Sequence, residues 1–124
     1  MGLGPHLYLF DLRGNLPVDP EHAHQDMTNA AFLNYLYQHS SWITQLFTYE
    51  LPLNGPSLDE GHSWGEGQDE SFSKDDLQQF LAELRKVPRP QDDDVFLAWN
   101  YDQLMRLVTV AVTNPHLTLT RAVL

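Results

Sequence analysis

Two histidines with a nearby carboxylate are the first residues in this chain that could do chemistry. A single residue separates His22 from His24, and Asp26 follows. A catalytic zinc site needs three protein ligands held on rigid elements, and the third here would be Asp26, His62 or His116. The surrounding prolines predict a loop. We therefore expect His22 and His24 to cap backbone groups, and keep as an alternative a small metal-dependent hydrolase that uses His22, His24, His62 and an acid.

A second group, His62-Ser63-Trp64-Gly65-Glu66, holds the residue types of a nucleophilic site. Serine hydrolases place the serine on a strained turn in a G-x-S-x-G context, and no serine of this chain has that context. The phosphate-binding pattern G-x-x-x-x-G-K-[ST] is absent, and the chain has no cysteine. These absences exclude a thiol nucleophile and a disulfide framework. We expect a binding protein with no catalytic residue, no metal and no cofactor.

Acidic residues dominate the charge of the chain. Seventeen Asp and Glu face seven Lys and Arg, for a formal charge of −10. Nucleic-acid affinity comes largely from Lys and Arg, so this balance excludes a nucleic-acid partner. Residues 59–76 hold seven acids and one lysine, and residues 92–94 are all aspartate. Acids concentrated in this way steer a basic partner to the surface, although they also serve solubility alone.

These two stretches are the predicted binding surface for a basic protein. Trp64 lies among acids in a polar segment, a composition typical of an interface anchor, and the alternative is that its ring folds back over the sheet. The predicted partner-binding residues are Asp59, Glu60, His62, Trp64, Glu66, Asp69, Glu70, Asp92, Asp93 and Asp94.

In general character the chain resembles bacterial immunity proteins, which neutralise secreted nuclease-like toxins: it is short, acidic and without catalytic motifs. The resemblance implies an inhibitor that occludes a basic toxin domain. A phage-encoded inhibitor that mimics nucleic acid is a further alternative. Apolar runs are too short to span a membrane and residues 1–5 do not form a signal peptide, so we expect a soluble cytoplasmic protein.

The elements that must position these residues follow from periodicity. Residues 6–12 alternate like a buried strand, and residues 16–27 hold two prolines and predict a loop. Thr28 is the expected N-cap of a long helix over 28–49, whose excess of aromatic residues favours a homodimer through this helix. Residues 52–72, acidic and glycine-rich, predict a long loop.

The second half of the chain predicts a helix and two strands with a further element between them. Ser73 as N-cap and Asp76 at N3 start a helix that ends before Pro88. Residues 95–99 are an apolar run typical of a buried strand, and residues 116–123 alternate like a final strand. Asn100 is the expected cap of a third helix, although residues 104–113 suit a strand equally well. The expected fold class is α+β, one domain over residues 1–124, with a small three-stranded sheet, about three helices and the order β-α-α-β-α-β.

Overall fold

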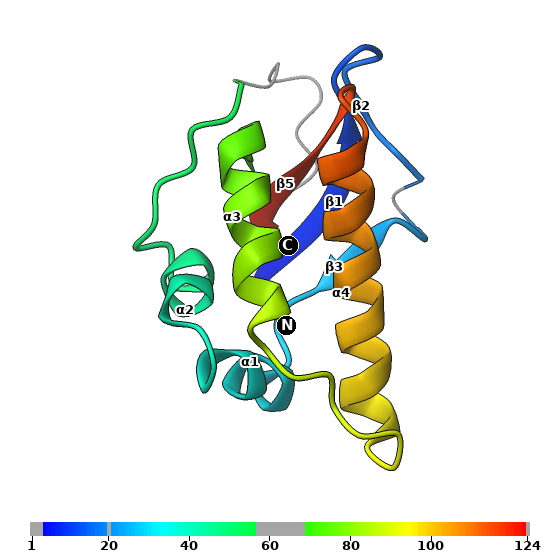
Figure 1. Cartoon of the computed structure of the whole chain (residues 1–124). Coiled ribbons are helices and arrows are strands. Elements are labelled where there is room, and N and C mark those ends of the chain that lie inside the picture. Colours follow the sequence, from blue (N-terminus) through cyan, green and yellow to red (C-terminus); the bar gives the residue numbers. More distant parts are fainter. Residues whose placement is uncertain (1–3, 20, 57–68, 124) are drawn as a thin grey trace.

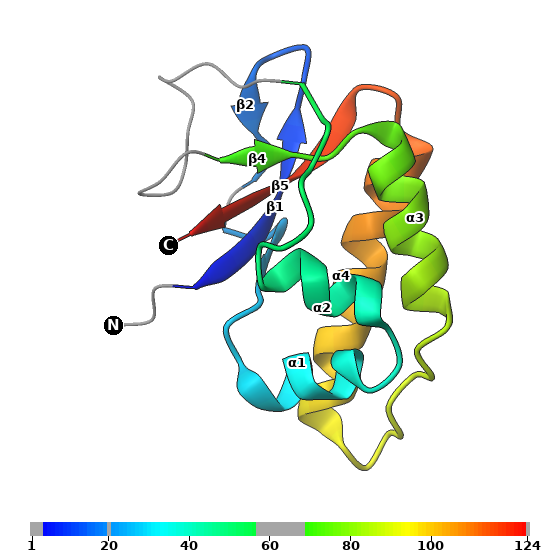
Figure 2. The ribbon, with the colours of Figure 1, turned by 90° about the vertical axis from the view of Figure 1, so that its left-hand side faces the viewer.

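A computed structural model describes residues 4–19, 21–56 and 69–123. An antiparallel sheet forms one layer, and the helices cover one of its faces (Figures 1 and 2). The expected α+β class is therefore confirmed. No helix among the described residues is both long enough and apolar enough to cross a membrane.

Two long strands form the centre of the sheet. β1 (Pro5–Asp11) pairs with β5 (Leu117–Val123) along its whole length, close to the strands predicted at 6–12 and 116–123. Alternation places Leu7, Leu9 and Leu119 in the main core beneath the helices, whereas Tyr8 and Phe10 pack with Ala122 in a separate buried cluster. Both faces of β1 are thus buried.

Short strands extend this pair, so the described sheet has five strands rather than three. β2 (Leu16–Pro17) and β3 (His24–Asp26) both pair with β1, and β4 (Glu70–Ser71) pairs with β5. The prediction of a loop over 16–27 is wrong where β2 and β3 form. These short strands form because β1 has free backbone N–H and C=O groups along its edge, which no local sequence pattern reveals. β4 lies within the expected 52–72 loop, of which residues 57–68 are outside the described part.

The single helix predicted over 28–49 is two helices. α1 (Ala30–Tyr37) begins after Asn29, not Thr28, and α2 (Ser41–Phe47) begins after Ser40. The Ser40 side chain accepts the backbone N–H of Ile43 at 3.1 Å and so starts a new helix. The aromatic residues that favoured a homodimer pack largely against the core, among them Tyr35, Tyr37 and Trp42. The homodimer remains a prediction.

α3 (Lys74–Arg85) starts as the sequence predicts. The Ser73 hydroxyl accepts the N–H of Asp76, and the Asp76 carboxylate accepts the N–H of Ser73, both at 3.0 Å. This capping box satisfies two backbone donors that the first turn of a helix leaves unpaired.

α4 (Val95–Thr113) corrects the prediction for the next segment. The strand predicted at 95–99 is wrong, because these residues form the first turns of the helix, and residues 104–113 continue it. Asn100 is not a cap but a buried residue inside α4. The N-cap is Asp94, whose carboxylate accepts the N–H of Leu97 at 3.3 Å. α3 and α4 therefore follow each other directly and pack together, as Figure 1 shows.

Candidate protein-binding surface

Three large apolar side chains are exposed at the start of α4. The exposed fractions are 71% for Val95, 49% for Phe96 and 61% for Trp99. Because a helix repeats every 3.6 residues, Ala98 and Tyr101 turn inward while these three turn outward. We call Val95, Phe96 and Trp99 the apolar ridge. Exposed apolar groups that lie together in this way are typical of interaction surfaces.

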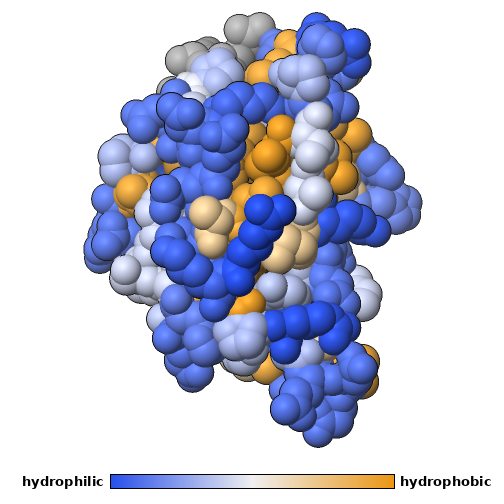
Figure 3. All heavy atoms as spheres, in the orientation of Figure 1, coloured by the Kyte–Doolittle hydropathy of each residue, from blue (hydrophilic) through white to orange (hydrophobic). Residues whose placement is uncertain are grey.

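Aspartates lie directly beside the apolar ridge. Asp92, Asp93 and Asp94 precede α4 and are all exposed. Asp94 caps the helix, and Asp92 accepts a hydrogen bond from Nη1 of Arg89 at 2.7 Å. Asp93 has no hydrogen bond or ion pair within the described part of the chain. Figure 3 shows the same end of the molecule, at the bottom of the view, as a mostly hydrophilic lobe with hydrophobic colour at its edge.

The basic residue of this region, Arg89, is neutralised within the protein. Its Nε and Nη2 donate to Oδ1 and Oδ2 of Asp102 at 2.9 and 2.8 Å, in addition to the bond to Asp92. The hydrogen bonds from Arg89 lower the pKa of Asp102, and the two carboxylates raise the pKa of Arg89. The 88–94 turn is thereby tied to α4 and keeps its negative character.

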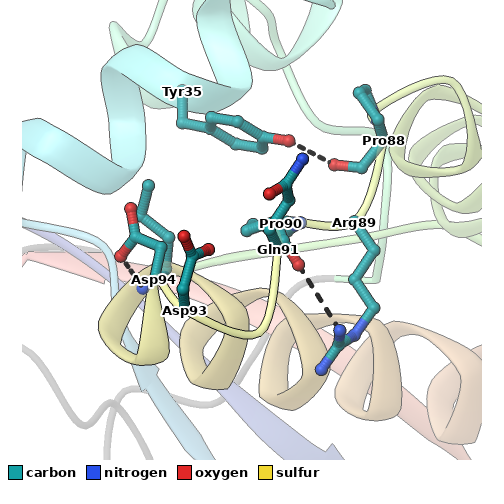
Figure 4. A pocket seen from close by; sticks show the side chains of 8 residues that line it. Tyr35, Pro88, Arg89, Pro90, Gln91, Asp93 and Asp94 are labelled. Carbon is teal, nitrogen blue, oxygen red and sulfur yellow. Dashed lines mark hydrogen bonds between the residues drawn. The ribbon is translucent and has the colours of Figure 1, made fainter.

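A hollow of about 650 Å³ lies between the 88–94 turn and α1 (Figure 4). Tyr35 forms one wall, and its hydroxyl donates to the carbonyl of Pro88 at 2.5 Å. Figure 4 shows the side chain of Arg89 running away from Tyr35, with Asp93 and Asp94 on the other side of the turn. The complete lining is Tyr35, Pro88, Arg89, Pro90, Gln91, Asp93, Asp94 and Leu97. We call it the acidic hollow.

Two further hollows share Trp99. One of about 470 Å³ lies between the starts of α1 and α4 and includes Asp26, Phe96 and Trp99 in its lining. The other, of about 560 Å³, is lined by Glu21, His22, Trp99, Asp102, Gln103 and Arg106. The apolar ridge therefore lies between depressions whose linings include carboxylates, one of which also holds the basic side chain of Arg106.

The predicted partner-binding residues fall into three groups by their location. Asp92, Asp93 and Asp94 lie on the surface just described. Asp69 is buried and accepts a hydrogen bond from the Tyr8 hydroxyl, and Glu70 forms an ion pair of 2.8 Å with Arg121. Both carboxylates have internal roles, so we do not include them in the candidate surface. Asp59, Glu60, His62, Trp64 and Glu66 lie outside the described residues.

The described histidines of the metal hypothesis do not come together, and His62 lies outside the described residues. Nδ1 of His22 lies 2.9 Å from Oδ1 of Asp19, and the hydrogen bond to Asp19 raises the pKa of His22. His24 lies with Nε2 2.8 Å from Nδ1 of His6, and burial lowers the pKa of both rings. Among residues 4–19, 21–56 and 69–123, no three His, Asp or Glu form a group that could hold a metal ion.

The sequence analysis did not predict that Phe96 and Trp99 are exposed, because it assigned residues 95–99 to a buried strand. A signal for the alternative was present. Ala98, Tyr101, Leu104 and Val108 recur at three- and four-residue spacing, and that spacing extends the helix back toward an aspartate N-cap. The same periodicity turns Phe96 and Trp99 outward.

Comparison of the chain with protein-family models, with curated proteins and with solved structures finds no match.

Proposed function

We propose that this protein is a small acidic inhibitor that binds a basic protein, as a bacterial immunity protein does when it neutralises a nuclease-like toxin in the cytoplasm. The observation that carries the proposal is the apolar ridge beside Asp92–Asp94. Interfaces combine a desolvated aromatic centre with a polar rim that selects the partner, and this end of α4 holds both parts.

The mechanism is occlusion. A nuclease binds phosphates with Lys and Arg, and carboxylates presented at the same spacing pair with those side chains in place of the substrate. Phe96 and Trp99 supply apolar contact area with few rotatable bonds, so their ordering on binding costs little entropy. The rigid turn held by Arg89 and Asp102 keeps the carboxylates in position beforehand.

The net charge of −10 supports the choice of a basic partner over a neutral one. Long-range attraction raises association rates by about 10- to 1,000-fold at low salt. An inhibitor of a lethal enzyme gains from fast capture, because each free toxin molecule turns over substrate until it is bound.

The test starts from the reading frame immediately upstream of this gene. The C-terminal domain of its product is expressed in cells with and without the full chain. We expect cells to survive only when the chain is present, and the two proteins to form a stable complex. Failure of the chain to protect the cells overturns the proposal. Protection against a DNA-binding enzyme encoded elsewhere, with none against this domain, favours a phage-type inhibitor instead.

A matched pair of variants locates the surface. Val95→Glu places a carboxylate on the apolar ridge, and Val110→Glu makes the same change on the exposed side of α4 about 22 Å away. We expect Val95→Glu to weaken protection and Val110→Glu to retain it, with both variants folded by circular dichroism. Equal protection by the two variants contradicts the placement of the interface on the ridge.

A further inference from the structure

The acidic hollow is lined by groups that suit a cationic side chain and disfavour an anion. Asp93 and Asp94 contribute carboxylates, while Pro88 and Pro90 have no backbone N–H to offer an anion. The first-turn N–H of Leu97 is already bonded to Asp94. One of the backbone N–H groups that could bind a phosphate or carboxylate at the start of α4 is therefore already hydrogen-bonded within the protein.

The one cation in the lining does not repel a second one. Arg89 is bound by the carboxylates of Asp92 and Asp102, so its charge is compensated within the protein. Its side chain runs away from Tyr35, as Figure 4 shows. Asp93 has no such partner among the described residues, so its carboxylate is open to a ligand.

The remaining lining residues are compatible with the rest of an arginine side chain. Leu97 and Pro90 provide apolar surface for the methylene stem, Tyr35 provides an aromatic ring, and Gln91 adds a neutral amide beside the Tyr35 hydroxyl (Figure 4). The Tyr35 hydroxyl is held by the carbonyl of Pro88, which fixes the ring in place. A guanidinium stacks on aromatic rings and binds carboxylates in a plane, whereas an ammonium does neither as well.

We propose that the acidic hollow receives an arginine side chain of the partner, with the guanidinium at Asp93 and Asp94 and its flat face toward Tyr35. The proposal rests on the proposed function, because it assigns the first basic contact of the same binding surface. The neighbouring apolar ridge, which no group covers among the described residues, supports the same placement of a docked protein at this end of α4.

The test uses the full chain and three short peptides, which are Ac-Gly-Arg-Gly-NH₂ and its lysine and citrulline counterparts. Binding of each peptide is measured by NMR titration. We expect the arginine peptide to shift the signals of Tyr35 and Leu97 saturably, the lysine peptide to bind more weakly, and the neutral citrulline peptide not to bind. Equal binding of the arginine and lysine peptides overturns the choice of arginine. Shifts spread evenly over all exposed carboxylates overturn the site.

The variant Asp93→Asn/Asp94→Asn removes both charges and keeps a good N-cap, because asparagine caps helices as well as aspartate. We expect it to weaken binding of the arginine peptide by about fivefold, the equivalent of one modest ion pair. Asp75→Asn, an exposed change on α3, is the matched control and leaves binding unchanged. An equal effect of both variants counts against the hollow.

The outcomes separate the inference from the proposed function. A chain that binds the arginine peptide here but fails to protect cells refutes the inhibitor and leaves the hollow as an arginine site. A chain that protects cells equally well with and without Asp93→Asn/Asp94→Asn, and binds no peptide, refutes the hollow alone.

Discussion

The side-chain amide of Gln25 donates a hydrogen bond to Oδ1 of Asn100 at 2.7 Å, and both residues are buried. The bond joins β3 to α4 at the residue that follows Trp99. Asn100 also donates to the carbonyl of Phe96 at 2.8 Å, so one amide connects the sheet edge with the helix turn that carries the apolar ridge. Within the described part of the chain, Oε1 of Gln25 has no hydrogen-bond partner.

Asn100→Leu is expected to destabilise the protein by about 1–3 kcal/mol, because it leaves the buried Gln25 amide with only its long hydrogen bond of 3.4 Å to the carbonyl of Asp26. Gln25→Leu/Asn100→Leu removes both polar groups and is expected to recover most of that loss. Urea unfolding of both variants and of Gln25→Leu measures the coupling. Additive losses would show that the two side chains act independently.

Ser40 is expected to contribute more than an ordinary N-cap. Its hydroxyl accepts the N–H of Ile43 and donates to Oε1 of Glu83 at 2.8 Å, which links α2 to α3. We expect Ser40→Ala to cost about 2 kcal/mol by thermal or urea unfolding, at the upper end for a cap. Ser73→Ala, a cap without a link to another helix, is the comparison. A larger loss for Ser73→Ala would contradict the role of the Glu83 bond.

Glu70 is expected to affect folding rather than binding. Its carboxylate lies 2.8 Å from Nη2 of Arg121, whose exposed fraction is 2% and whose Nη1 donates to the carbonyl of Leu46. Glu70→Gln weakens the compensation of a buried cation, and we expect a loss of about 1–2 kcal/mol because the carboxylate itself is partly exposed. The measurement is urea unfolding beside a binding assay. If Glu70→Gln left the free energy of unfolding unchanged but weakened binding of the partner, Glu70 would be a residue of the binding surface instead.

Acidic pH is expected to destabilise the fold through His6 and His24. The rings stack at 5.0 Å, and burial lowers the pKa of both, with His6 contributing further to the shift of His24. The unfolded chain protonates these residues at pH about 6.5, whereas the folded protein does so only at lower pH. The unfolded state therefore holds more protons in this interval, and the free energy of unfolding falls as pH drops below about 6.5.

Unfolding curves of the native chain and of His24→Gln, recorded between pH about 7.5 and 5, measure this loss, which the variant is expected to reduce. His22→Gln is the control, because the pKa of His22 is raised and its protonation does not oppose folding. Asp26, with a pKa lowered chiefly by hydrogen bonds from Thr28, contributes its loss only at lower pH. A stability that stays constant or rises toward pH 5 would refute the histidine effect.

Salt is expected to slow capture of the basic partner more than it speeds release. Asp93→Asn/Asp94→Asn removes two exposed charges beside the ridge, and we expect a severalfold lower association rate at low salt with a smaller salt dependence. Stopped-flow association across a salt titration measures both. Identical association rates for the native chain and the variant at every salt concentration would contradict the hypothesis that Asp93 and Asp94 steer the partner electrostatically.

Local signals predicted the parts of the fold that depend on neighbouring residues alone. Strict alternation predicted β1 and β5, and the spacing of Ser73 and Asp76 predicted the start of α3. The role of Ser40 as an N-cap was not predicted, because a serine between two segments of helical periodicity is compatible with one continuous helix until its hydrogen-bond partners are known. β2 and β3 were missed because two- and three-residue strands depend on the edge of β1.

The sequence by itself determined the charge of this protein, the placement of its acids, the absence of cysteine chemistry and the α+β class. Only the tertiary structure decided which of those acids are available to a partner. Asp69 and Glu70 form bonds to residues 61 and 51 positions away in the chain, whereas Asp93 does not. It also decided that Phe96 and Trp99 stay exposed. Helical spacing turns both side chains away from the core, but no local pattern specifies whether another element packs over them.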